Sequence, residues 1–314
     1  MKLASIDIGT NSTRLLIADY QKNKFIHLKR KMKITRLGKG LEQKGIVLDD
    51  SAERTLDTVL GYSGLIKSHN VERYRAVGTS ALRKASNSDW FISYIYKNSG
   101  IKIDIISGEE EAGLSFYGAV KEMDLKSSFF KKKQSGSVLV VDIGGGSSEF
   151  ILGDDSCNLK LIKSIDIGCV SLTEKFIGAA IPDKDSLDSM HSYIEDSLEK
   201  VIEKINSLRP ISIIGVAGTI TALAAIDLEL KKYDSDRIHW HILSLKRVEE
   251  IYKKLCSLSL KSRKEVTGLN PKRADIIIGG TAILLTILKM IKNRYIMASE
   301  KDILDGIIYS LIDF

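Results

Sequence analysis

Proline, cysteine and long apolar runs are all scarce in this 314-residue chain. Only three prolines occur, which argues against long proline-rich or disordered linkers. The three cysteines, Cys157, Cys169 and Cys256, are scattered and form no C-x-x-C pair, so they indicate neither a disulfide framework nor a zinc site. Free thiols are typical of a reducing compartment, and we therefore expect a cytoplasmic protein.

Membrane-spanning and secreted proteins are disfavoured by the same sequence. The longest uncharged apolar stretches, 211–226 and 276–288, are shorter than a membrane-spanning helix and contain glycine, so they predict buried core. At the amino terminus, Asp7 interrupts what would be the apolar core of a signal peptide.

Positive charge is in excess. Forty-seven lysines and arginines against 40 acidic residues give a net charge of +7. A basic surface favours polyanionic partners such as nucleic acid, an anionic membrane or a phosphate-rich substrate, although a merely lysine-rich, solvated surface has the same composition. The basic run HLKRKMKITRLGKG at 27–40 is open to both interpretations.

Two stretches of the chain match each other without a gap. SIDIGTNSTRLLIADY begins at Ser5 and VVDIGGGSSEFILGDD begins at Val140, with Asp7 aligned to Asp142. Two copies in register indicate two structurally related halves, and the length of the chain fits two domains.

Each copy predicts a β-hairpin that could hold phosphate. Neither contains the lysine of a Walker loop, and short apolar runs ended by turn residues follow the glycines. Glycines at the bend let backbone N–H groups converge on an anion, and the serine and threonine hydroxyls add donors. The aspartate before each turn could hold a metal ion or orient a water. Two ordinary glycine-bearing hairpins are the alternative.

A third glycine element, GVAGTITALAAIDL at 215–228, predicts a strand, a turn and a helix. The helix N-terminus beside Gly218 and Thr219 could receive an anion.

Seven motifs in order carry a family resemblance: DIGTNSTRLLI, AVGTSALRKASN, ISGEEEAGLSFYGAV, DIGGGSSEFILG, GCVSLTEKF, GVAGTITALAA and KRADIIIGGTAILL. On these motifs the sequence resembles the exopolyphosphatase and guanosine pentaphosphate phosphatase family over essentially its whole length. Two departures stand out. Ser171 occupies a position that is basic in many members, and the chain ends at Phe314 without the further helical region of longer members, so we expect the short two-domain form.

The resemblance implies an α/β fold of two duplicated actin-like domains with a cleft between them. We expect domain I at 1–125, completed by a C-terminal helix near 300–314 that starts after Ser299, and domain II at 126–299. A polar, basic loop at 124–137 is expected between them. A homodimer is expected, with no membrane and no specific nucleic acid as partner.

Hydrolysis of a phosphoanhydride needs a cradle for phosphate, usually a divalent ion, and a positioned water. The expected phosphate-binding residues come from the glycine elements and from Arg83: Thr10, Asn11, Ser12, Thr13, Arg14, Arg83, Gly144, Gly145, Gly146, Ser147, Ser148, Gly218 and Thr219. Asp142 and Asp7 are the expected ligands of Mg²⁺ or Mn²⁺, because carboxylates are hard oxygen donors.

Which carboxylate is catalytic can be assigned only from the resemblance. Taken alone, Glu109, Glu110 and Glu111 would be interpreted as a solvated helix start. The resemblance implies that Glu111, directly before the alanine, is the catalytic glutamate, and Glu149 is the second candidate, positioning the water or the metal.

The expected function is exopolyphosphatase. Guanosine pentaphosphate 5′-phosphatase is the alternative, because both reactions would use the same site. A carbohydrate kinase of the same superfamily is disfavoured by the glutamate-rich SGEEEA motif, and a catalytically silent nucleotide- or polyphosphate-binding module by the presence of Glu111 and Glu149.

Overall fold

The computed structural model describes residues 1–22, 24–121, 137–154, 158–177, 181–210, 212–291 and 294–312. The chain divides into two compact units, Met1–Gly118 with Ile303–Phe314 and Ala119–Asp302. The domain bounds expected from the sequence, 1–125 with 300–314 and 126–299, stay a prediction. The expected loop at 124–137 lies, apart from Ser137, outside the described residues.

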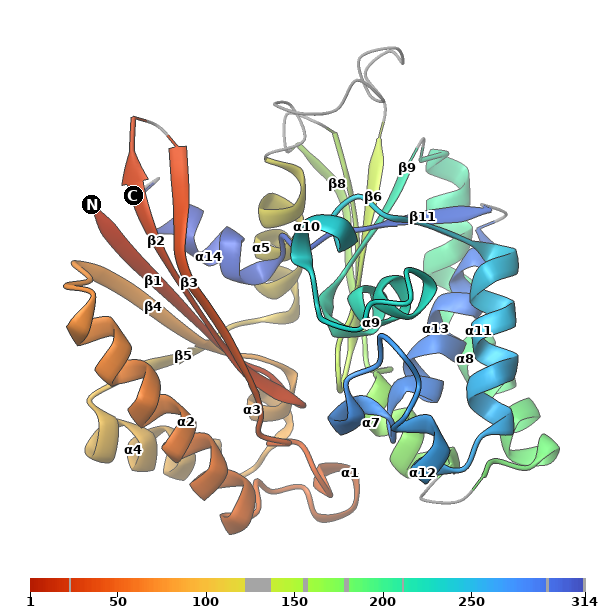
Figure 1. The fold of residues 1–314 in the computed structure, drawn as a ribbon, viewed down its shortest axis with the longest axis horizontal. Helices are drawn as coiled ribbons and strands as arrows, with labels where there is room; N and C mark the ends of the chain where they lie inside the picture. Colours follow the sequence, from red (N-terminus) through yellow and green to blue (C-terminus); the bar gives the residue numbers. More distant parts are fainter. Residues whose placement is uncertain are drawn as a thin grey trace. The chain divides into compact units, whose positions relative to one another are not determined.

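Unit 1 contains a five-stranded mixed sheet in the order β3-β2-β1-β4-β5 (Figure 1). β2 and β3 run antiparallel to their neighbours, whereas β4 and β5 run parallel to β1. The strands are β1 (Lys2–Ile8), β2 (Ser12–Gln21), β3 (Lys24–Ile34), β4 (Arg73–Gly78) and β5 (Ile103–Ile105). The helices are α1 (Leu41–Lys44), α2 (Asp49–Ser68), α3 (Ser80–Lys84), α4 (Ser88–Ser99), α5 (Gly108–Val120) and α14 (Ile303–Ser310).

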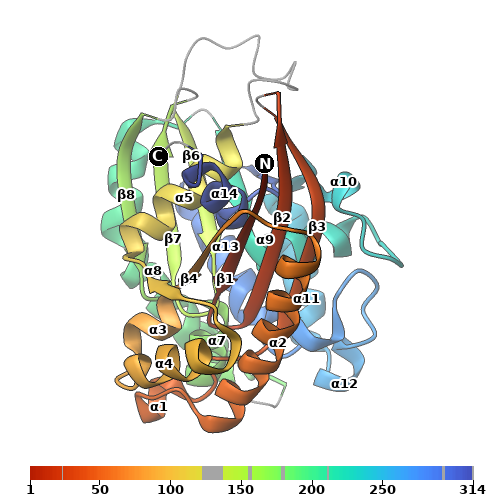
Figure 2. The ribbon, with the colours of Figure 1, turned by 90° about the vertical axis from the view of Figure 1, so that its left-hand side faces the viewer.

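Both faces of the unit 1 sheet are covered. Alternate residues of a strand point to opposite faces, so Ala4, Ile6 and Ile8 of β1 pack with α2 and α4, while Leu3 packs with Leu304 of α14. Figure 2 shows α2 and α14 against this sheet. Burial on both sides explains why every residue of β1 after Lys2 is buried, including the polar Ser5 and the charged Asp7.

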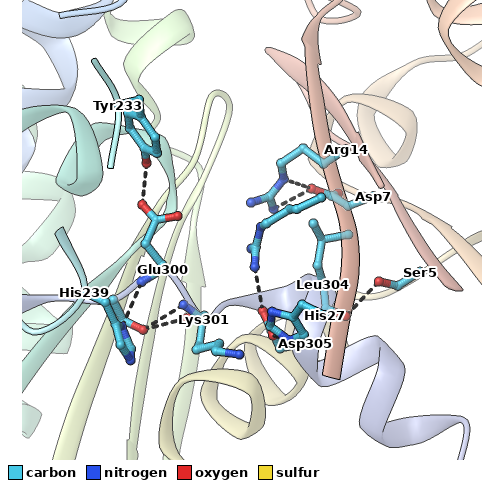
Figure 3. A network of polar contacts seen from close by, with 12 residues as sticks. Ser5, Asp7, Arg14, His27, Tyr233, His239, Glu300, Lys301, Leu304 and Asp305 are labelled. Atoms are coloured by element: carbon cyan, nitrogen blue, oxygen red, sulfur yellow. Dashed lines mark hydrogen bonds and ion pairs between the residues drawn. The ribbon is translucent and has the colours of Figure 1, made fainter. Parts of the chain in front are cut away.

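The C-terminal helix starts later than the sequence predicts. α14 begins at Ile303, whereas the capping pattern at Ser299 predicts a start near residue 300. The Ser299 hydroxyl instead bonds the backbone N–H and carbonyl of Lys301, so it closes a turn rather than capping the helix. Asp305 of α14 is buried and contacts His27 and Arg30 of β3, at 3.1 Å each, which fastens the helix to the edge strand (Figure 3).

Unit 2 contains a six-stranded mixed sheet in the order β10-β11-β9-β6-β7-β8. Its strands are β6 (Val138–Ile143), β7 (Ser148–Gly153), β8 (Leu159–Ile165), β9 (Ser212–Val216), β10 (Ile242–Ser244) and β11 (Tyr295–Ala298). Its helices are α7 (Cys169–Leu172), the π-helix η1 (Thr173–Ile177), α8 (Lys184–Leu208), α9 (Ala217–Asp227), α10 (Ser235–Ile238), α11 (Leu245–Ser257), α12 (Leu260–Arg263), the 3₁₀ helix η2 (Pro271–Arg273) and α13 (Ile277–Met290).

The two predicted apolar stretches form the centre of unit 2. α9 and α13 are buried on nearly every side and pack with α8 and α11 in one hydrophobic core. The helices of the described residues include none long and apolar enough to cross a membrane.

Five strands of the unit 2 sheet repeat the topology of the unit 1 sheet, and β10 is added at the edge antiparallel to β11. β6 pairs antiparallel with β7 and parallel with β9, as β1 does with β2 and β4. β8 then extends the antiparallel side and β11 the parallel side, as β3 and β5 do in unit 1. This confirms the predicted α/β fold of two duplicated, actin-like domains, and the cleft between them stays a prediction.

Candidate phosphate-binding and catalytic site

The first predicted hairpin is formed by β1 and β2. Gly9 N–H donates to the Ser12 carbonyl at 3.0 Å and closes a tight turn. The register places Asp7 opposite Arg14, whose Nε and Nη2 donate to Asp7 Oδ2 at 2.8 and 2.6 Å (Figure 3). Asp7 is buried, so this ion pair compensates the charge of a carboxylate that the sequence predicts as a metal ligand.

The second hairpin, β6 and β7, repeats this backbone with different chemistry. Gly144 N–H donates to the Ser147 carbonyl at 3.0 Å, as Gly9 does to Ser12. The register places Asp142 opposite Glu149, so the position of Arg14 in the first hairpin is taken by a second acid. Asp142 is 6% exposed and Glu149 is 1% exposed, and Ser164 Oγ donates to Glu149 Oε1 at 2.8 Å.

This acidic pair fits a divalent cation better than Asp7 does. Directly opposed residues of an antiparallel pair have neighbouring side chains, and two buried carboxylates side by side are stabilised by a cation or a shared proton. Within the described residues no group of three or more His, Cys, Asp and Glu side chains is arranged to hold a metal. Mg²⁺ typically uses one or two carboxylates and takes its other oxygens from water and substrate phosphate, which is compatible with Asp142 and Glu149.

The hydroxyls that follow the two turns are partly used inside the fold. Thr13 Oγ1 bonds Thr35 Oγ1 at 3.0 Å, and Ser148 Oγ donates to the Ile167 carbonyl at 2.7 Å. Both side chains are fully buried. Thr13 therefore ties the first hairpin to the segment after β3, and Ser148 ties the second hairpin to the segment after β8. Ser12 and Ser147 lie one residue nearer the turn.

The Gly144–Gly146 loop rests on the segment after β8. Cys169 N–H donates to the Gly144 carbonyl at 3.0 Å, and a Cβ on Gly168 would lie 2.3 Å from the Gly145 carbonyl oxygen, so only glycine fits there. Ser171 Oγ bonds the backbone of Gly168 and thus closes this turn. Burial raises the pKa of the Cys169 thiol to about 11, which keeps it protonated and unreactive.

The third glycine element is a strand, a turn and a helix, β9 into α9, as the sequence predicts. A residue from outside this element, Arg273 of η2, also lies against it and was not predicted from the sequence. A Cβ on Gly218 would lie 2.2 Å from Arg273 Nη1, so the Arg273 guanidinium lies against the turn beside Thr219. The buried Arg263 fixes this segment by donating from Nη1 to the Ala274 carbonyl at 2.9 Å. The KRAD motif contained Arg273, but no local pattern indicated its partner.

In unit 1 the remaining predicted residues gather where the parallel strands end. β1 leads into Thr10 and Asn11, β4 into α3 with Arg83, and β5 into α5 with Glu111. The carboxyl ends of parallel strands meet at one edge of a sheet, which is where ligands bind in open α/β folds.

Glu111 is distinguished from the neighbouring acids by its partner. Arg83 Nη1 lies 2.6 Å from Glu111 Oε2 and also donates to the Ile106 carbonyl at 3.1 Å. Their side chains are 22% and 12% exposed. Glu110 pairs instead with Arg75, on a more exposed part of the helix. The structure therefore brings together Arg83, the expected charge clamp, and Glu111, the expected catalytic glutamate.

Comparison with known proteins agrees with these features. The model of the Ppx/GppA phosphatase family matches residues 16–313. Exopolyphosphatase 2 of Mycobacterium tuberculosis is 32% identical over 99% of this chain and 98% of its own length. A bifunctional 3-dehydroquinate synthase/phosphatase of Fusobacterium nucleatum is 36% identical over 97% of this chain, which spans only 46% of that longer protein.

A solved structure supports the same conclusion. An exopolyphosphatase from Cytophaga hutchinsonii, 29% identical, superposes with a TM-score of 0.89 and covers 100% of this chain and 98% of its own. With seven ordered motifs, two matching sheets and a family match across nearly all residues, the chain belongs to the Ppx/GppA phosphatase family.

Proposed function

We propose that this protein is an exopolyphosphatase that hydrolyses the terminal phosphoanhydride bond of inorganic polyphosphate and releases orthophosphate. The full-length similarity to the mycobacterial exopolyphosphatase supports this substrate. Guanosine pentaphosphate is the alternative substrate, and it would be attacked at the same kind of bond.

The pairing of Arg83 with Glu111 is the observation that carries the proposal. In the resting state the guanidinium compensates the carboxylate. When a phosphoryl group takes over Arg83, Glu111 is released from its ion pair and becomes a better proton acceptor, because loss of a neighbouring positive charge raises the proton affinity of a carboxylate. Glu111 then accepts a proton from the attacking water, and Arg83 balances charge on the phosphoryl oxygens.

Unit 2 has candidate anion-binding groups of its own. Backbone N–H groups of the Gly144–Gly146 loop, the Gly218–Thr219 turn and the Arg273 guanidinium would bind phosphoryl oxygens of the substrate. Asp142 and Glu149 would hold Mg²⁺ or Mn²⁺, which supplies further positive charge to those oxygens when bound.

A phosphate-release assay tests the proposal. Long-chain polyphosphate, guanosine pentaphosphate and ATP are each supplied with Mg²⁺ and, separately, with a chelator. The expected result is fastest release from polyphosphate and loss of release on chelation. Faster release from guanosine pentaphosphate would establish the alternative, and no release from either would reject the hydrolase function.

Cytoplasmic location and a homodimer complete the proposal. The mass of the purified protein in solution tests the dimer, and fractionation of cells tests the location.

A further inference from the structure

Three polar side-chain atoms of unit 1 are buried without a hydrogen-bond partner. They are Thr10 Oγ1, Asn11 Nδ2 and Ser80 Oγ, in residues that are only 7%, 7% and 3% exposed. Buried polar groups are nearly always satisfied, and an unsatisfied one destabilises the folded state. Three such atoms in one unit therefore indicate a group that is added from outside the chain.

The three atoms belong to one edge of the sheet. β1 and β4 are parallel neighbours whose last paired residues are Ile8 and Gly78, and Thr79 N–H continues the ladder to the Ile8 carbonyl at 3.3 Å. Thr10 and Ser80 therefore lie at the carboxyl edge of the sheet, each two residues beyond the end of one of two adjacent strands.

The backbone around Thr10 and Asn11 is fixed although their polar atoms are unsatisfied. Gly38 N–H donates to the Thr10 carbonyl at 2.9 Å, and a Cβ on Gly38 would lie 2.3 Å from Thr10 Cγ2. The Asn11 carbonyl accepts from Thr35 and Arg36 at 3.1 and 3.0 Å. The methyl group of Thr10 thus packs on Gly38, and this packing restricts the directions that its hydroxyl can take.

The chemistry of the three groups selects the ligand. Two hydroxyls and an amide N–H₂ can all donate, and Arg83 follows Ser80 in the same short helix. Donors beside a guanidinium match an anion with several acceptor oxygens. We propose that Ser80 completes, with Thr10 and Asn11, a phosphoryl-binding subsite within unit 1, and this proposal rests on the proposed phosphatase function.

The subsite would hold its anion away from bulk water. The three atoms are shielded from solvent in this structure, so the covering side chains must move aside when the anion enters. Hydrogen bonds to an anion are stronger in such a shielded place than in water.

Two substitutions remove an unsatisfied hydroxyl while changing little else. Ser80→Ala deletes Oγ, and Thr10→Val keeps the methyl group that packs on Gly38. Ser63→Ala is the matched control, because Ser63 is also buried but its hydroxyl donates to the Ser99 carbonyl at 3.1 Å. Each variant is measured for its melting temperature with and without orthophosphate, and for the inhibition constant of orthophosphate, the reaction product.

The subsite predicts opposite effects for substitutions at Ser80 and Thr10, whose hydroxyls are unsatisfied, and at Ser63, whose hydroxyl is hydrogen-bonded. Ser80→Ala and Thr10→Val should keep or raise the melting temperature without phosphate, and should raise the inhibition constant about tenfold, the loss expected for one hydrogen bond to a charged group. Ser63→Ala should lower the melting temperature and leave the inhibition constant unchanged. A lower melting temperature for Ser80→Ala with an unchanged inhibition constant would show that its hydroxyl has a structural role and would overturn the subsite.

The melting experiment separates this inference from the proposed function, because it needs no turnover. If orthophosphate stabilises the unsubstituted protein but not Ser80→Ala, the subsite holds even where polyphosphate is not hydrolysed. If orthophosphate stabilises neither protein, the subsite is rejected even where hydrolysis is observed.

Discussion

Glu111 is the residue on which the proposed chemistry depends most directly. Glu111→Gln keeps the shape of the side chain but cannot accept a proton, so we expect turnover to fall about 10²–10⁴-fold while the substrate still binds. Steady-state kinetics with polyphosphate measure the first effect, and binding to the inactive variant measures the second. Glu110→Gln is the matched control, because Glu110 lies one residue away and pairs with Arg75. Equal losses in both variants would argue against a specific role for Glu111.

Asp142 and Asp7 occupy equivalent positions but have different partners, and metal dependence should separate them. Asp142 faces Glu149 across its hairpin, whereas Asp7 faces Arg14. Asp142→Asn should therefore raise the Mg²⁺ concentration for half-maximal activity by about tenfold or more, the scale on which ligand-shell changes act. Asp7→Asn should weaken the ion pair with Arg14 and lower the melting temperature, with little effect on the Mg²⁺ requirement. Activity that survives exhaustive chelation would contradict the metal site altogether.

At the scale of elements, one histidine joins three helices of unit 2. His191 on α8 contacts Thr286 Oγ1 on α13 at 3.3 Å and Tyr252 Oη on α11 at 3.0 Å. Burial lowers the pKa of His191 below its usual value of 6.5. The unfolded chain, with the higher pKa, then binds the proton more tightly, so this contribution to stability is present above about pH 6.5 and is lost as the pH falls below it.

His191→Gln should weaken this acid sensitivity, because glutamine does not titrate. The free energy of unfolding, measured by denaturant titration at pH 7.5 and 5.5, should differ less between the two pH values in the variant than in the unsubstituted protein. His69→Gln, at the end of α2, serves as the control substitution. A pH difference that is unchanged by His191→Gln would assign the acid sensitivity to other groups.

Secondary structure was predictable where its signal was local. The two hairpins and the β9–α9 turn are confirmed, because glycine position and apolar alternation act within a few residues. The start of α14 was predicted three residues early, because the capping pattern at Ser299 is overridden by bonds to Lys301 and by the contact of Glu300 with Tyr233 (Figure 3).

At the scale of the whole molecule, the net charge of +7 predicts a salt effect that depends on substrate length. The structure places Lys29, Lys31 and Lys33 at alternate positions of the edge strand β3, opposite Ile17, Leu15 and Thr13, and so on one face of the sheet. A long polyanion should be attracted more strongly than a nucleotide, and salt screens this attraction beyond about 8 Å at physiological ionic strength. Polyphosphate turnover at limiting substrate should therefore fall more steeply with salt than turnover of guanosine pentaphosphate.

Changing Lys29, Lys31 and Lys33 to glutamine should raise KM for long chains selectively. Arg30 is left intact, because its guanidinium binds Asp305 and its loss would disturb α14. The control carries the same charge change on α8, at the exposed residues Lys184, Lys200 and Lys204. Equal salt slopes for both substrates, or equal KM changes in both variants, would show that the run on β3 is ordinary surface. A second basic run, at 131–133, lies outside the described residues.

The sequence by itself determined the duplicated α/β architecture, the three glycine turns and the acidic and basic residues near them. A repeat is visible from aligning the chain with itself, and glycine conformation and hydrophobic periodicity are properties of neighbouring residues. Only the tertiary structure decided which partner each residue has: Arg14 for Asp7, Glu149 for Asp142, Arg83 for Glu111 and Arg273 for the Gly218 turn. The last two pairs join residues that are 28 and 55 positions apart in the sequence. Such pairs are set by strand register and by the packing of distant segments, and no local pattern encodes them.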